Sequence, residues 1–313
     1  MTTYTQTKIA QSRWTLTATS VYAVLVCLAT GPIAQQLWIQ MLLLGLSTLL
    51  MAEFNNVNSL IRIYSHMVSC SLLVMTTMSS FLFSAIEPFA VQAALIAFFF
   101  CLFKAYQKPT ATGWILYAFF AFGIASIAFV QMLFFVPILW ILMANNVMAF
   151  SARTFFASIL GVIAPYWFLA PYYIYIGNAD FFARHFTNLV QIDSVFNLSL
   201  LDEHRIITII FIFLLALIGS LHFIYYSYQD KIRTRMIYET FIALDCCCFA
   251  LMVVLPQYFN QFLGVAIVTT APLIGHYLAL SHTKISNICF FAVIALALII
   301  TVYNLWMPLT IFS

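Results

Sequence analysis

The sequence predicts an all-α fold, a polytopic bundle of about eleven transmembrane helices. Three observations lead to this prediction. Hydrophobic residues make up 65% of the 313 positions and charged residues only 7%, whereas a soluble domain carries about 25% charged residues. The apolar residues form long repeated runs, and helices and closed barrels are the structures that satisfy their backbone inside a bilayer. The basic residues, finally, fall between alternate runs.

Each apolar run is close to the ~20 residues that a helix needs to cross a bilayer. The expected segments are 14–31, 36–52, 63–85, 88–106, 113–128, 130–147, 154–176, 206–226, 241–257, 259–281 and 286–307. Gly123 and Pro137 interrupt the fifth and sixth segments, so we expect short or tilted helices there, and full crossing of this pair stays open. Almost every segment belongs to one bundle, which predicts a single integral membrane domain over residues 1–313.

The charges predict the orientation of the chain. With a cytoplasmic N-terminus, all Lys and Arg residues except Arg184 and Arg205 fall in loops on the cytoplasmic side. Loops that stay in the cytoplasm carry an excess of Lys and Arg. The run "QDKIRTR" (229–235) is the strongest anchor of this kind. An odd number of segments then places the C-terminus on the extracytoplasmic side.

The longest connection, residues 177–205, falls on the extracytoplasmic side. It mixes acidic and basic side chains with aromatic residues such as Phe181 and Phe182. This mixture suits a segment that lies at the membrane–water interface, in part as a surface helix. Loops of this length often carry function, and a plain connection is the alternative.

Glu87 is the single charged residue in "SSFLFSAIEPFAVQAALIAFFF" (79–100). It directly precedes Pro88, which suits the first turn of a helix. The helix dipole stabilises a carboxylate there by about 0.3–1 kcal/mol. Glu87 is therefore either a structural charge at a helix start or a functional acid at the outer membrane face.

One stretch of the chain has a family resemblance. "GWILYAFFAFGIASIAFVQMLFFVPILWILM" (113–143) is followed by "RTFFASILGVIAPYWFLAPYYIYIGNADFFARHF" (153–186). This order resembles the polyprenyl-phosphate-sugar-dependent membrane glycosyltransferases of the GT-C fold over about residues 60–190. The positions that carry the resemblance are Gly123, Gln131, Pro137, Arg153, Pro165, Tyr166, Trp167, Asp180 and Phe181. The chain also resembles uncharacterised bacterial inner-membrane proteins, which implies that membrane as its location.

The resemblance implies transfer of a sugar from a polyprenyl-phosphate donor on the outer face of the membrane. Glu87 and Asp180 are then the candidate catalytic acids. The candidate substrate-binding residues are Gln131, Arg184, His185 and Arg205. Arg184 and Arg205 are the outer cations, and guanidinium matches phosphate oxygens in a bidentate way. A divalent metal is an alternative activator of the acceptor hydroxyl, but no residues are assigned as its ligands.

The chain departs from this family at one important place. The family carries a catalytic acid in a long first outer loop, whereas "GPIAQQ" (31–36) is short and has no acid. The alternative is therefore a non-catalytic relative that binds lipid or a membrane-protein partner in cell-envelope assembly. A transporter is less favoured because the two halves lack the internal symmetry typical of that class. No motif indicates nucleic-acid binding.

Asp245 lies inside an apolar segment, in "FIALDCCCFALMVVLP". An acid within the membrane is a functional candidate by default. Its place near the cytoplasmic start of segment 241–257 favours pairing with Arg233 or Arg235, and a proton or ion relay is the alternative.

Histidines and the "DEHR" run (202–205) supply weaker candidates. His276 and His282 are six residues apart, a spacing that does not place them on one helical face and disfavours a shared metal. His222 is expected at the cytoplasmic interface. In "DEHR" we expect Asp202 and Glu203 to cap the next helix and Arg205 to pair with one of them, with ligand binding in an outer cavity as the alternative.

Overall fold

A computed structural model describes residues 5–30, 37–177, 180–190, 196 and 201–311, with side chains up to residue 306. The described residues form helices and no strands, which confirms the all-α prediction. The short first outer loop, 31–36, lies outside the described residues.

Seven helices of the described chain are long and apolar enough to cross a membrane, so the chain is an integral membrane protein of the helical-bundle type. They are α4 (Trp38–Asn58), α6 (Glu87–Leu102), α9 (Ala152–Tyr175), α11 (Glu203–Tyr226), α12 (Ile232–Val254), α13 (Phe259–Leu280) and α14 (Lys284–Ile311). The 3-10 turns η2 (Phe103–Ala105), η5 (Ser227–Gln229) and η6 (Pro256–Tyr258) adjoin three of them.

Four of the eleven expected segments form shorter apolar helices. These are α2 (Thr15–Ala29), α5 (Met67–Met78), α7 (Thr112–Ala128) and the pair η3 (Val130–Phe135) with α8 (Val136–Asn145). Within the expected segment 63–85, α5 stops at Met78 and a 3-10 turn, η1 (Ser80–Ser84), follows. Two further helices, α1 (Thr5–Ala10) and α10 (Asp180–Val190), are too short to span. Length alone therefore supports seven crossings among the described residues.

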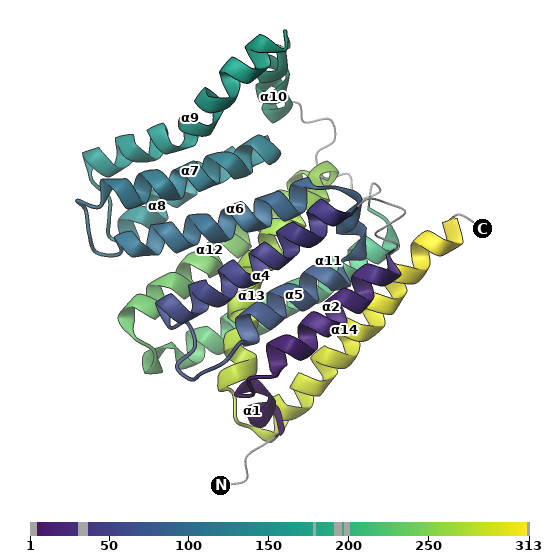
Figure 1. Ribbon diagram of the computed structural model, residues 1–313. Coiled ribbons are helices and arrows are strands. Elements are labelled where there is room, and N and C mark those ends of the chain that lie inside the picture. Colours follow the sequence, from purple (N-terminus) through teal and green to yellow (C-terminus); the bar gives the residue numbers. More distant parts are fainter. Residues whose placement is uncertain (1–4, 31–36, 178–179, 191–195, 197–200, 312–313) are drawn as a thin grey trace.

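Helix α13 forms the centre of the bundle. It contacts α5, α6, α11 and α12, and 94% of its most apolar stretch of 18 residues is buried. On one side α6 packs on α7 and α7 on α9, while α2 and α14 pack on α5 at the other side. Figure 1 shows this arrangement as a broad row of roughly aligned helices, with α9 near one edge and α14 near the other.

Glycine lets α11 approach α13 closely. A Cβ added to Gly219 would lie 2.7 Å from the carbonyl carbon of Leu273. Gly161 of α9 is equally tight, because its Cβ would lie 2.7 Å from the carbonyl oxygen of Leu116 in α7. Small residues of this kind are typical of helix interfaces inside membranes.

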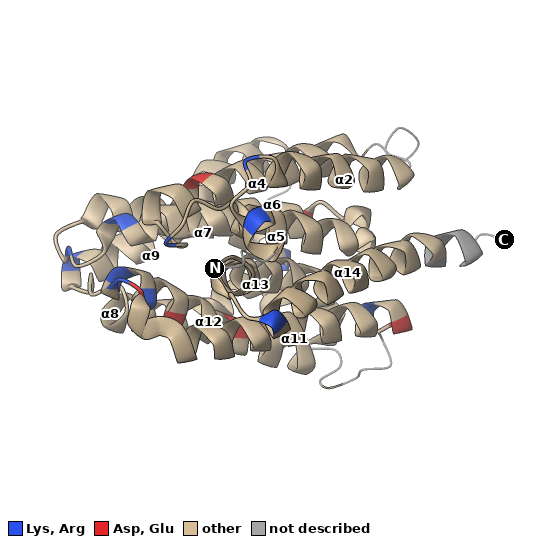
Figure 2. Cartoon of the chain, turned by 90° about the horizontal axis from the view of Figure 1, so that it is seen from below, with Lys and Arg blue, Asp and Glu red and all other residues tan. Residues whose placement is uncertain are grey.

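The two ends of the bundle differ in charge. The basic end is where α4, α6, α8, α11 and α13 finish, and all Lys and Arg residues lie there except Arg184 and Arg205 at the opposite end. One contact near each end of the bundle is consistent with this division. Arg62 donates to Gln229 (2.8 Å) at the basic end, whereas Asn304 donates to the carbonyl of Met78 (2.8 Å) at the opposite end. Figure 2 shows most basic residues away from the end where α14 finishes.

Candidate functional site

Glu87 lies at the opposite end, as the first residue of α6, and is exposed. Ile86 takes the N-cap position without a side-chain hydrogen bond, and Pro88 follows Glu87 in the first turn. Among the described residues Glu87 has no hydrogen-bond or ion-pair partner. The prediction of a charge at a helix start is thereby confirmed, and the stabilisation comes from the helix dipole.

The surface helix predicted within 177–205 is present as α10. Gln131 of η3 is 2% exposed and donates its amide to the carbonyl of Asn188 in α10 (3.1 Å). His185 of α10 lies 3.1 Å from the carbonyl oxygen of Ser126 and 3.4 Å from the hydroxyl of Tyr166. These bonds fasten α10 over the turn between α7 and α8.

Aromatic rings complete the seat of α10, that is, the side chains of α7, η3 and α9 on which this helix packs. Phe181 stacks on Tyr173 of α9, with ring centroids 4.0 Å apart and planes 3° apart. Burial among these rings lowers the pKa of His185, and the bond to the Ser126 carbonyl partly offsets this effect. Asp180 and Arg184 lie on the same helix, and both are exposed.

Arg205 belongs to a separate group at the start of α11. Its Nε lies 3.6 Å from a carboxylate oxygen of Asp202, and its guanidinium lies 5.9 Å from the centroid of the Phe81 ring. His204 meets the same ring edge to face. The expected pairing with Arg205 is confirmed. Asp202 takes the expected N-cap position, although its side chain makes no capping hydrogen bond, and Glu203 follows as the first residue of the helix.

The predicted catalytic and binding residues are thus only partly brought together. Gln131 and His185 meet through α10, while no hydrogen bond or ion pair in the described chain joins Glu87 to Gln131, His185 or Arg205. No group of three His, Cys, Asp or Glu side chains in the described chain could hold a metal ion.

An apolar groove of about 470 Å³ opens between α2 and α14, with α5, α11 and α13 behind it. Its lining runs from Trp14 and Thr15 at the basic end to Tyr22 and Ala297 further along. Two of the polar groups along it are already bonded, since the Tyr22 hydroxyl lies 2.6 Å from that of Thr301 and Thr19 bonds Cys70. The groove offers an almost wholly apolar surface.

A polar hollow adjoins this groove at the basic end. Gln11, Arg13, Ile63 and Tyr64 line one part of it. Ile63 and Tyr64 also line a second part, together with polar and basic residues that include Asn55, Asn56, Ser59, Arg62, Ser65, Lys231 and Thr234. Arg13 and Lys231 are exposed, and neither has a hydrogen-bond or ion-pair partner within the described chain.

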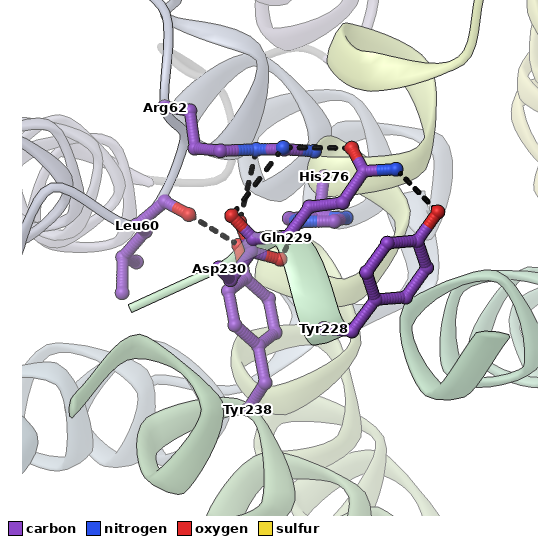
Figure 3. A network of polar contacts seen from close by, with 7 residues as sticks. All are labelled: Leu60, Arg62, Tyr228, Gln229, Asp230, Tyr238 and His276. Carbon is purple, nitrogen blue, oxygen red and sulfur yellow. Dashed lines mark hydrogen bonds and ion pairs between the residues drawn. The ribbon is translucent and has the colours of Figure 1, made fainter. Parts of the chain in front are cut away.

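The basic end is closed by a buried polar network (Figure 3). Arg62 Nε lies 3.0 Å from one oxygen of Asp230, and His276 Nε2 lies 3.1 Å from the other. The side chains of Asp230 and His276 are fully buried, whereas that of Arg62 is 36% exposed. Tyr238 donates to the carbonyl of Leu60 (3.3 Å) beside this network. The ring of His222 lies 5.6 Å from that of His276.

The expected pairing of Asp245 with Arg233 or Arg235 is wrong. Helix α12 begins at Ile232, so Asp245 lies more than three turns inside it. Its carboxyl group instead accepts hydrogen bonds from Thr269 and Thr270 of α13. Arg233 donates to the side chain of Asn58 (2.8 Å) and to the carbonyl of Phe103 (2.9 Å).

Comparison with protein-family models, curated proteins and solved structures finds no match to this chain.

Sequence reasoning missed Asp230 and the groove. Asp230 stands in "QDKIRTR", a run whose basic residues drew attention to topology. An acid directly before a run of cations, at a helix boundary, was a usable signal of a buried ion pair. The groove had no such signal, because its lining residues come from six helices that are spread along the whole sequence.

Proposed function

We propose that this chain is an inner-membrane protein that binds an anionic lipid, its chain in the groove and its headgroup in the polar hollow. The proposal extends the predicted alternative of a non-catalytic GT-C relative that binds lipid. It includes eleven crossings, a cytoplasmic N-terminus and an extracytoplasmic C-terminus, so the headgroup would lie on the cytoplasmic side.

The observation that carries the proposal is that groove and hollow share one stretch of chain. Ser12 and Trp14 line the groove, while Gln11 and Arg13 line the hollow. A molecule that follows this stretch passes from cationic to apolar surroundings. An amphiphile with a phosphate headgroup matches both, because guanidinium binds phosphate oxygens in a bidentate way and each buried CH₂ contributes about 0.8 kcal/mol.

Native mass spectrometry of the protein in nanodiscs tests this proposal. We expect retention of phosphatidylglycerol or undecaprenyl phosphate, two sources of the same headgroup chemistry, and little retention of phosphatidylcholine. Competition between the two anionic lipids shows which source is preferred.

Two variants with matched controls separate headgroup from chain. Arg13→Gln should weaken retention of anionic lipid about tenfold, equivalent to 1.4 kcal/mol, whereas Arg153→Gln, also exposed at the basic end, should not. Ala18→Trp fills the groove, while Val24→Trp alters an exposed residue of the same helix outside its lining. Equal retention by Arg13→Gln, Ala18→Trp and the unmodified chain would contradict the proposal.

Sugar transfer is the second candidate function. What favours it is the resemblance over residues 60–190, together with the short helices α7 and α8 and the surface helix α10, which is bonded to α7 and η3. Glu87, exposed at the same end, is then the candidate acid. Glu87→Gln should abolish transfer from a polyprenyl-phosphate sugar, while Glu203→Gln, another first-turn acid at that end, should not. Retained transfer in Glu87→Gln would remove Glu87 from the site. A membrane-protein partner stays a prediction.

A further inference from the structure

Asp245 lies deep in the bundle. Its partners Thr269 and Thr270 occupy the middle of α13, the most buried helix of the molecule. Leu280 ends that helix at the basic end, ten to eleven residues away, which at 1.5 Å per residue is about 15 Å. This is about half of the ~30 Å hydrocarbon thickness of a bilayer. Asp245 itself is 3% exposed.

No cation of the described chain compensates this carboxyl group. The hydroxyl of Thr269 donates to Oδ1, and the hydroxyl of Thr270 lies 3.1 Å from Oδ2 and 3.3 Å from Oδ1. Neither a hydrogen bond nor an ion pair joins Asp245 to Lys, Arg or His in the described chain. Hydrogen bonds from two neutral donors do not offset the free energy that it costs to remove an isolated charge from water. Such a group therefore takes up a proton and becomes neutral. As a neutral acid, Oδ2–H can donate to the oxygen of Thr270.

A row of buried titratable groups leads from the basic end toward this acid. It starts at Arg62, which is partly exposed, and passes through Asp230 to His276 of α13. Figure 3 shows these three side chains pointing toward one another. Nδ1 of His276 is buried and has no hydrogen-bond partner among the described residues. The same is true of Nδ1 of His222, whose ring lies beside that of His276.

The remaining gap runs along α13. His276 is six residues beyond Thr270, a rise of about 9 Å. Tyr238, whose ring lies 5.0 Å from that of His276, is two turns before Asp245 on α12. Cys248 lies one turn beyond Asp245 and donates to the carbonyl of Phe262. One or two transient waters would span such a gap, since buried waters bridge polar groups in this way.

We propose that Asp245 is an intramembrane proton-binding site, loaded from the basic end through Asp230 and His276. A proton from water at the basic end binds Nε2 of His276, the ring nitrogen that contacts the Asp230 carboxylate. The other ring nitrogen releases a proton through water to the Asp245 carboxylate, which becomes the neutral acid bonded to Thr269 and Thr270. Unloading reverses these transfers, and no oxidant or reductant takes part. Chains of Asp and His inside membranes serve proton transfer in pumps and transporters.

Infrared spectroscopy of the purified protein in nanodiscs tests the site. At neutral pH we expect a protonated-carboxyl C=O band that disappears in Asp245→Asn, an isosteric change that can still accept from both threonines. Thr270→Val keeps the acid and removes one bond, so the band should shift and remain; this variant serves as well if Asp245→Asn fails to fold. Absence of the band in the unmodified protein, or its loss on adding NaCl at constant pH, would overturn the proposal.

The rate at which the band shifts after transfer to D₂O tests the route. His276→Gln and Asp230→Asn should slow this exchange by about tenfold, as a barrier higher by 1.36 kcal/mol would. His282→Gln is the matched control, because His282 lies at the same end but is exposed. An unchanged exchange rate in His276→Gln and Asp230→Asn would overturn loading from the basic end. Lipid retention plays no part in these measurements, so their outcome is independent of the proposed function.

Discussion

Nε2 of His276 lies 3.1 Å from a carboxylate oxygen of Asp230, and both side chains are fully buried. The other oxygen of Asp230 contacts Arg62 at 3.0 Å. One carboxylate thereby ties the loop between α4 and α5, the turn between α11 and α12, and the last turns of α13. The basic end of the bundle is closed by this three-way contact, although the residues involved are far apart in sequence.

Loss of this carboxylate should destabilise the protein. Asp230→Asn removes the charge that Arg62 and His276 share, and we expect the free energy of unfolding to fall by about 1–3 kcal/mol. Asp202→Asn is the control, because the exposed pair of Asp202 with Arg205 contributes only about 0–1 kcal/mol. Denaturant unfolding in detergent measures both variants. Equal losses in the two would contradict a special role for the buried carboxylate.

The contact of α11 with α13 should not tolerate a methyl group at Gly219. A Cβ there would lie within 2.9 Å of three backbone atoms of Leu273 and Ile274, so the helices must separate, at a cost of about 1–3 kcal/mol. Gly45→Ala in α4 meets nothing within 4 Å and should be neutral or stabilising by about 0.5–1 kcal/mol. Thermal unfolding of the two variants gives the comparison, and a neutral Gly219→Ala would refute the close packing.

The seat of α10 should depend on Gln131. Gln131→Ala removes the bond to the Asn188 carbonyl, worth about 0.5–1.5 kcal/mol. Backbone amides of α10 should then exchange with deuterium several times faster than in the unmodified protein, as a loss of this size implies. Exchange of α13 amides in the same sample is the internal control. Uniform acceleration of both helices would point to general destabilisation instead.

Acid should release α10 through His185. Burial lowers the pKa of His185 in the folded state, while a free histidine has a pKa of about 6.5. The released state therefore binds more protons, and stability of the seat falls as pH drops through about 6.5 toward the lower folded pKa. We expect α10 exchange, corrected for its intrinsic pH dependence, to rise between pH 7.5 and 5.5. His185→Gln should remove this rise, and a rise that persists in the variant would assign it to another group.

Cysteine labelling distinguishes eleven crossings from seven. With eleven, Tyr64→Cys, at an exposed position between α4 and α5, reacts with a membrane-impermeant maleimide only from the cytoplasmic side, and Glu203→Cys only from the outside. If α2, α5, α7 and α8 do not cross, α4 carries the chain from the cytoplasm to the outside, so residue 64 lies outside while residue 203 keeps its side. The unmodified protein supplies the background from its seven native cysteines.

The sequence located the helices well because their signal is local. Runs of apolar residues predict the helical class, and the mixed charges and rings near Phe181 predict the surface helix that became α10. The same reasoning failed at the start of α12. The apolar run starts at residue 241, whereas the helix begins at Ile232. The first turns of the helix are polar, and they are held at the basic end of the bundle because Arg233 bonds Asn58 and Phe103 there. Asp245 was therefore assigned both the wrong depth and the wrong partners.

The sequence by itself determined that this chain lies in a membrane and that its cations gather at one end, since composition and charge act residue by residue. Only the tertiary structure decided which polar groups meet. Asp245 faces Thr269 and Thr270 because α12 packs on α13, and Asp230 meets His276 because the chain turns before α12. The groove likewise exists only once α2 and α14 stand apart on α5. Such contacts depend on the relative positions of helices, which periodicity along a single chain does not encode.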